Sequence, residues 1–142
     1  MKTLKSIMIA LVLMVACGTV KANTVNEDAN LTKTYAVNTY VNAMTRGKLD
    51  GLNEVLDKSV KFSMLRGKEM LSFDKKQMLS FMQKDKNVSQ ACTTSTTVVE
   101  SNADVAVVRV DMQFDGFVRS NYLTVANTGS GWKITNVYSV FK

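Results

Sequence analysis

Four stretches in the second half of the chain have the alternating or β-branched composition of β-strands. They span residues 88–99, 103–114, 117–126 and 132–142. Alternation of apolar and polar residues with a period of two is typical of strands that bury one face. Asp115-Gly116 and the Asn- and Gly-rich run at 127–131 separate the last three stretches and favour tight turns. The pattern therefore predicts a four-stranded antiparallel meander.

The first half of the chain shows apolar residues at helical spacing instead. A first helix is expected from Asn30, a residue type that caps helices well, to Gly47, where the spacing stops. A short second helix is expected near 49–56, with Asp50 as its cap.

A strand hairpin and a third helix come next. Residues 59–65 alternate in polarity, Arg66-Gly67-Lys68 favours a turn, and 69–73 returns as a short strand. Asp74 is then placed to cap a helix that runs to about Lys84.

The order of these elements indicates the fold class. Helices that are segregated from an antiparallel sheet make an α+β fold. We expect the N-terminal helices to pack on a curved antiparallel sheet, in a single domain over residues 30–142. A curved sheet closed by helices leaves a conical cavity with an open mouth, which is a natural site for a small molecule.

The N-terminus has the parts of an export signal. Lys2 and Lys5 are basic, an apolar run covers 7–15, and Val20-Lys-Ala22 is a cleavage site with small residues. We therefore expect residues 1–22 to be a signal peptide, and the mature protein to be exported to the periplasm or secreted.

A second interpretation of the same segment is a lipoprotein signal. Met14-Val-Ala-Cys17 resembles a lipoprotein box, in which Cys17 would carry the lipid and the signal would cover 1–16. Residues 23–29 are polar and expected to be loose. A lipid at Cys17 is the one membrane attachment that the sequence suggests.

Composition limits the classes of function. The chain contains no histidine, so it lacks the commonest metal ligand and proton shuttle. Residues 1–22 carry three of the 18 basic residues, and without them the formal net charge falls from +6 to +3. The remaining basic residues are scattered, which argues against nucleic acid as a partner. Cys92 is interpreted as a small buried hydrophobe. We expect no metal and no cofactor.

Several segments resemble, in their succession, a known family. They are the helix of Tyr35 to Gly47, Ser59-Val-Lys-Phe62, 74–82, Ala103-Asp-Val-Ala106, Tyr122-Leu-Thr-Val125 and Gly131-Trp-Lys-Ile134. The chain resembles the nuclear-transport-factor-2-like (SnoaL-like) superfamily over about 30–142, and within it the secreted bacterial family labelled "putative lumazine-binding". The resemblance implies a cone-shaped α+β fold of the cystatin-like kind, often dimeric through the sheet. It implies no particular activity, because this fold carries enzymes, binders and scaffolds alike.

The resemblance and the strand alternation together predict the residues of the cavity. Trp132 and Ile134 match core positions of the family, so residues on their faces should point inward. The expected ligand-binding residues are Tyr40, Phe62, Met64, Met112, Arg119, Asn121, Asn136 and Tyr138.

Arg119 is the candidate with the clearest chemistry. An inward guanidinium offers a planar fork to a carboxylate or a similar anion. The alternative is that Arg119 lies at the rim and pairs with a surface acid, Asp111 or Asp115. For Tyr40 and Tyr138 the alternative is that they are core residues whose hydroxyl groups have hydrogen-bond partners within the protein.

Three classes of function remain open. The first is non-catalytic binding of a small amphipathic or acidic molecule in the cone. The second is an enzyme similar to the ketosteroid isomerases, which would need a general base near the substrate, whereas alternation sends Asp111 outward. The third is a structural homodimer without a ligand, formed through the outer sheet face, where Arg109 would meet Asp111 across a two-fold axis.

Overall fold

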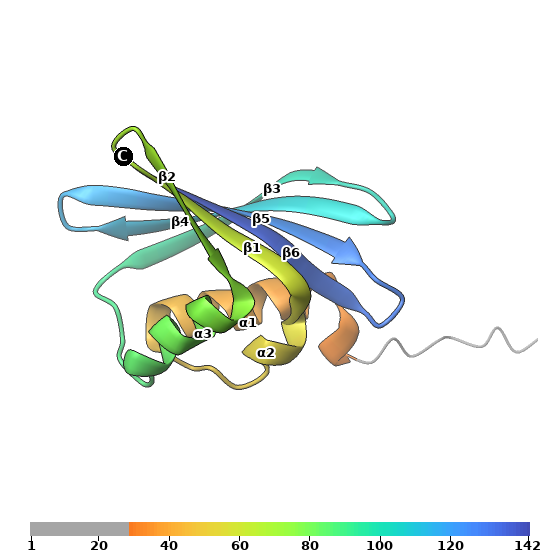
Figure 1. The fold of residues 1–142 in the computed structure, drawn as a ribbon. Coiled ribbons are helices and arrows are strands. Elements are labelled where there is room, and N and C mark those ends of the chain that lie inside the picture. Colours follow the sequence, from red (N-terminus) through yellow and green to blue (C-terminus); the bar gives the residue numbers. More distant parts are fainter. Residues whose placement is uncertain (1–28) are drawn as a thin grey trace, which may run out of the picture.

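The computed structural model describes residues 29–142 (Figure 1). The expected signal peptide at 1–22, the alternative lipidation site Cys17 and nearly all of 23–29 lie outside the described residues. Within 29–142, no helix has the length and apolar character needed to cross a membrane.

The helices begin and end close to the expected positions, with different caps at two of them. A 3-10 turn, η1 (Ala29–Leu31), precedes α1 (Lys33–Arg46). Thr32 rather than Asn30 caps α1, because its Oγ1 accepts a hydrogen bond from the Tyr35 N–H at 3.1 Å. Gly47 ends α1 in the left-handed region, as predicted.

The second and third helices differ in how firmly they are capped. α2 (Leu52–Val55) is a single turn, and Gly51 precedes it without a side-chain cap, so the prediction that Asp50 caps it is wrong. α3 (Lys75–Lys84) begins with a full capping box. The Asp74 carboxylate accepts from the Gln77 N–H at 2.8 Å, and the Gln77 side chain accepts from the Asp74 N–H at 2.9 Å.

Six strands form one sheet in the order β2-β1-β6-β5-β4-β3. They are β1 (Leu56–Arg66), β2 (Glu69–Asp74), β3 (Thr93–Ser101), β4 (Val105–Phe114), β5 (Phe117–Asn127) and β6 (Trp132–Phe141). The predicted meander of β3 to β6 is confirmed, and all neighbours are antiparallel except β1 and β6, which are parallel.

β3 begins at Thr93 instead of Val88. The preceding residues form a loop that is bonded to the end of α1. The Asn87 N–H donates to the Gly47 carbonyl at 2.9 Å, and the Gln90 N–H donates to the Thr45 carbonyl at 2.7 Å. These bonds occupy backbone groups that a strand would have used for its ladder.

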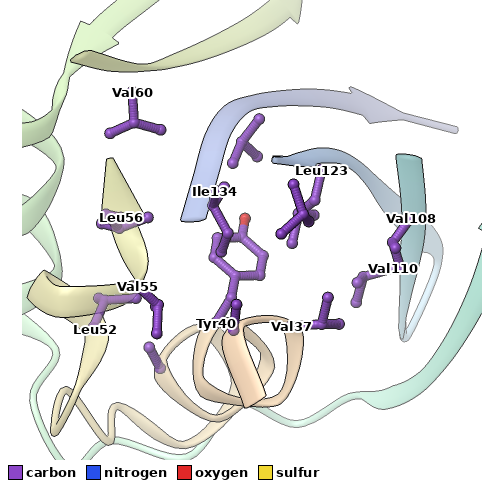
Figure 2. Close-up of a cluster of buried hydrophobic side chains, with 14 of the residues drawn as sticks. Val37, Tyr40, Leu52, Val55, Leu56, Val60, Val108, Val110, Leu123 and Ile134 are labelled. Carbon is purple, nitrogen blue, oxygen red and sulfur yellow. The ribbon is translucent and has the colours of Figure 1, made fainter. Parts of the chain in front are cut away.

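All helices of the described part lie on one face of the sheet, so the structure has an α layer and a β layer (Figure 1). The core fills the space between the layers (Figure 2). Its largest fully buried side chains include Tyr40 and Leu52 from the helices and Met112, Leu123, Ile134 and Val137 from the sheet. We call the sheet face toward the helices the inner face. The ends of α1 and α3 and the β4–β5 hairpin lie toward the same end of the molecule (Figure 1).

A β-bulge in β6 changes which of its residues face inward. Val125 pairs with Ile134, but the preceding Thr124 pairs with Asn136, so Thr135 is an extra residue in β6. Inward alternation therefore continues at Val137 and Ser139. The prediction that Asn136 and Tyr138 face inward is wrong, because the bulge turns both of them to the outer face.

Candidate functional site

Three polar side chains form a cluster on the inner face of β5 and β6. Asn121 Oδ1 accepts hydrogen bonds from Ser139 Oγ at 2.6 Å and from Arg119 Nε at 3.1 Å. Arg119 Nη2 is 3.4 Å from Ser139 Oγ, and Asn121 Nδ2 is 3.6 Å from the sulfur of Met112. Asn121 is completely buried and therefore needs these partners. The cluster orients the Arg119 guanidinium.

No carboxylate pairs with Arg119 among residues 29–142. The one ion pair in this range joins Arg109 to Asp111 at 3.0 Å, within the same strand and on the outer face. Ser120 also donates to Asp111 there. The alternative that Arg119 pairs with Asp111 or Asp115 is therefore wrong. Arg109 pairs with Asp111 within one chain, and a contact between them across a dimer axis stays a prediction. The guanidinium carbon of Arg119 lies 5.7 Å from the centre of the Phe141 ring.

A pocket of about 240 Å³ opens beside Arg119, between the helix layer and the sheet. The end of α1, α3 and the following loop form one wall, and β4 and β5 form the other. The lining residues are Ala43, Met44, Gly47, Met78, Phe81, Met82, Asp85, Val88, Gln90, Met112, Phe114 and Arg119. Four of them are methionines, whose flexible thioethers adapt to ligands of different shapes.

A second hollow of about 550 Å³ has Phe141 in its lining. Its lining residues are Met64, Leu65, Arg66, Gly67, Val140 and Phe141. Phe141 continues an aromatic run in which Phe117 lies 6.3 Å from Phe141 and is stacked on Phe114 at 4.7 Å. Arg119 lines the pocket, and Phe141, which lines the second hollow, is in contact with the Arg119 guanidinium.

The structure brings together some of the predicted ligand-binding residues and separates others. Met112 and Arg119 line the pocket, and Asn121 accepts a hydrogen bond from Arg119. Met64 lines the second hollow. Phe62 and Tyr40 are buried in the core and are not among the residues that line either hollow.

Sequence reasoning missed Ser139, Asp85 and Gln90. Ser139 carries a signal in retrospect, because two adjacent polar residues, Thr135 and Asn136, break the alternation between Ile134 and Val137. Asp85 lies in a segment without periodicity, and Gln90 lies in the part of 88–99 that forms a loop instead of the expected strand. Nothing in their local sequence places them beside Arg119.

Tyr40 holds a buried hydroxyl group. Its side chain points from α1 toward the strands that carry Leu123 and Ile134 (Figure 2). Its Oη has no hydrogen-bond partner among the described residues. Burial raises the pKa of the Tyr40 hydroxyl to about 12, and the nearby positive charge of Arg119 offsets a smaller part of this effect.

Tyr40→Phe is expected to increase the free energy of unfolding at pH 7 by about 1 kcal/mol, because a buried hydroxyl without a partner destabilises the folded state. The pKa in the folded state is above that of the unfolded chain, so below pH 10 ionisation of this hydroxyl does not change the free energy of unfolding. Between pH 10 and about 12 the unfolded chain loses the proton first, and the wild type should lose stability that the variant retains.

Urea unfolding of both proteins from pH 7 to 11 measures this difference, and the other tyrosines cancel in the comparison. A variant that is less stable than the wild type at pH 7 would show that the Tyr40 hydroxyl has a partner in solution.

Comparison with known proteins identifies relatives at the level of the family and the fold. A family model described as "Putative lumazine-binding" matches residues 27–139. No curated protein matches the chain.

Solved structures with the same fold cover most of the described chain. An NTF-2 like protein of unknown function from Silicibacter pomeroyi is 22% identical, with a TM-score of 0.62 over 77% of this chain and 90% of that chain. A cystatin-like fold protein from Burkholderia xenovorans is 16% identical, with a TM-score of 0.59 over 76% of this chain and 87% of that chain. A ketosteroid isomerase-like protein from Erwinia carotovora is 13% identical, with a TM-score of 0.55 over 76% and 92%. At these identities the similarity establishes the fold alone.

Proposed function

Because the chain belongs to the "putative lumazine-binding" family of the nuclear-transport-factor-2-like superfamily, we propose that it binds a small ligand in the pocket beside Arg119. The proposed ligand is a small amphipathic acid, and the binding is non-catalytic. We do not take lumazine from the family description as the ligand. The proposal rests on the chemistry of the pocket.

The environment of Arg119 is the observation that carries this proposal. A guanidinium that is partly removed from water is stabilised by an anion. No residue between 29 and 142 supplies one within 4 Å of Arg119. Asn121 and Ser139 hold the Arg119 side chain in place, so little conformational entropy would be lost when a ligand carboxylate accepts its remaining hydrogen bonds.

The walls of the pocket suit the apolar part of such a ligand. The apolar lining includes Met44, Met78, Met82, Met112, Phe81 and Phe114. A volume of about 240 Å³ is slightly below the range of roughly 300–1,000 Å³ that is common for ligand pockets. We therefore propose a ligand smaller than most drugs, held by one charged contact and by adaptable apolar contacts.

Arg119→Gln is expected to weaken binding of the ligand by about ten- to hundredfold, which is the usual effect of losing a charge-assisted hydrogen bond. Arg109→Gln is the matched control, because it removes the same charge from the opposite face of the same sheet. Native mass spectrometry of each protein, purified from its own cell extract, measures how much of the bound molecule is retained.

Two results would contradict this proposal. One is equal retention of the ligand by the wild type and Arg119→Gln. The other is a wild-type protein that carries no small molecule and is not stabilised by any compound in a library of amphipathic acids. The second result would favour the structural alternative.

We also propose that the protein is exported and forms a homodimer. Export rests on the signal-like sequence at 1–22, and detection of a mature N-terminus at Asn23 in the periplasmic fraction would test it.

The proposed dimer interface is the outer sheet face, which no helix of the described part covers (Figure 1). At its centre Tyr122 pairs with Tyr138, and both are half-buried. Light scattering of the purified protein tests this part, and a monomer would contradict it.

A further inference from the structure

The pocket beside Arg119 carries a negative group on its opposite wall. Arg119 belongs to the sheet, whereas Asp85 follows the last residue of α3 in the helix layer, and both line the pocket. Gly47, at the end of α1, lines the same wall as Asp85. The C-terminal end of a helix carries a partial negative charge that favours cations. Among the residues that line the pocket, Asp85 is the one acid and Arg119 is the one base, and they belong to opposite walls.

These two charges do not neutralise each other or pair with other residues of the described chain. The one ion pair within 29–142 is that of Arg109 with Asp111, so Asp85 has no Lys or Arg nitrogen within 4 Å there. The same criterion places Asp85 and Arg119 more than 4 Å apart. Lys84 is directed to the Phe81 ring, with its Nζ 5.6 Å from the ring centre.

Apolar side chains occupy the walls between the two charges. They are chiefly Met44, Met78, Met82 and Met112. A simple acid would use the contact to Arg119 alone, and a dicarboxylate would bring a second negative charge toward Asp85. A molecule with opposite charges at its two ends would complement both walls and place its carbon chain among the methionines.

We infer that the ligand is zwitterionic, with a carboxylate for Arg119, an ammonium group for Asp85 and a short apolar chain between them. This inference rests on the proposed function, because it specifies the ligand class of the same pocket. It predicts that binding depends on the separation of the two charges and not only on their presence.

Four small probes test this prediction. 6-Aminohexanoate carries its charges at opposite ends, and norleucine is its isomer with both charges on one end. Hexanoate lacks the ammonium group, and hexylamine lacks the carboxylate. Calorimetry or ligand-detected NMR with the folded protein should rank 6-aminohexanoate first. Its advantage over hexanoate should be roughly three- to tenfold, because Asp85 is exposed and solvent weakens such a contact.

Asp85→Asn should remove this advantage while hexanoate binds as before. Asp104→Asn is the matched control, because it removes the same charge just before β4, among exposed residues that do not line the pocket. Each variant is checked for an unchanged unfolding midpoint before its binding is compared.

The outcomes separate the inference from the proposed function. Equal affinity for 6-aminohexanoate and hexanoate, with both lost in Arg119→Gln, would overturn the zwitterion and leave the acid-binding pocket. Equal affinity for 6-aminohexanoate and norleucine would overturn the required charge separation. Failure of all four probes to bind the wild type would overturn the inference. Binding of a wider set of acids to the wild type and to Arg119→Gln would then test the proposed function separately.

Discussion

Gly47→Ala is expected to lower the free energy of unfolding by about 3–4 kcal/mol. Gly47 has a φ of 63°, where a residue with a Cβ is strained. The added Cβ would also lie 2.4 Å from the Asp85 carbonyl oxygen and 2.6 Å from the Asn87 nitrogen. Both contacts are with backbone atoms, so rotation of a side chain does not relieve them.

Gly67→Ala is the control that separates these two causes. Gly67 has a φ of 64°, but an added Cβ would meet no atom within 4 Å. Gly67→Ala should therefore lower the free energy of unfolding by the backbone strain alone, about 1 kcal/mol. Thermal or urea unfolding of the two variants measures the difference. Equal destabilisation would show that the loop at Asp85 moves away freely and that the close contact carries no energy.

Gly47→Ala should also affect the pocket. Gly47, Asp85 and Val88 all line it, so the segments that the methyl group pushes apart belong to its helix wall. Gly47→Ala should therefore weaken ligand binding more than Gly67→Ala, when both are measured well below their unfolding temperatures. Unchanged binding in Gly47→Ala would contradict the rigidity of this wall.

Asn121→Leu is expected to destabilise the protein by about 2–4 kcal/mol. The substitution keeps a side chain that branches at Cγ but removes the oxygen that accepts from Ser139 and Arg119. Ser139 is buried, so its hydroxyl would lose a partner that solvent does not replace. Arg119 would also lose the contact that orients it toward the pocket, and ligand binding should weaken together with stability.

A double variant tests this explanation. Adding Ser139→Ala to Asn121→Leu removes the donor that has lost its partner, so the double variant should be more stable than Asn121→Leu alone. Urea unfolding of the wild type, both single variants and the double variant completes the cycle. Additive losses of stability would show that Asn121 and Ser139 contribute independently.

Much of the fold follows from local patterns in the chain. Asp74 and Gln77 are three residues apart, which suffices for the capping box that begins α3. The alternation in 103–114 and 117–126 predicts β4 and β5 and their inward residues, including Met112, Arg119 and Asn121. The placement of Asp111 on the outer face follows from the same alternation.

The candidate site was harder to predict, because its residues come from distant parts of the chain. The bulge at Thr135 depends on pairing with β5. It places Val137 and Ser139, instead of Asn136 and Tyr138, on the inner face. A single extra residue reverses every later side chain in a strand. Asp85 reaches the pocket because α3 ends beside Gly47, which is a tertiary contact and not a property of its neighbours in sequence.

The sequence by itself therefore determined the α+β class, the order of the elements and the inward position of Arg119. These features depend on periodicity, caps and turns, which act over a few residues. Only the tertiary structure decided that Arg119 lacks an acidic partner, that Ser139 and Asn121 hold it, and that Asp85 lies on the opposite wall. The physical reason is that charge pairing and burial depend on which distant segments meet in the folded chain, and local composition does not contain that information.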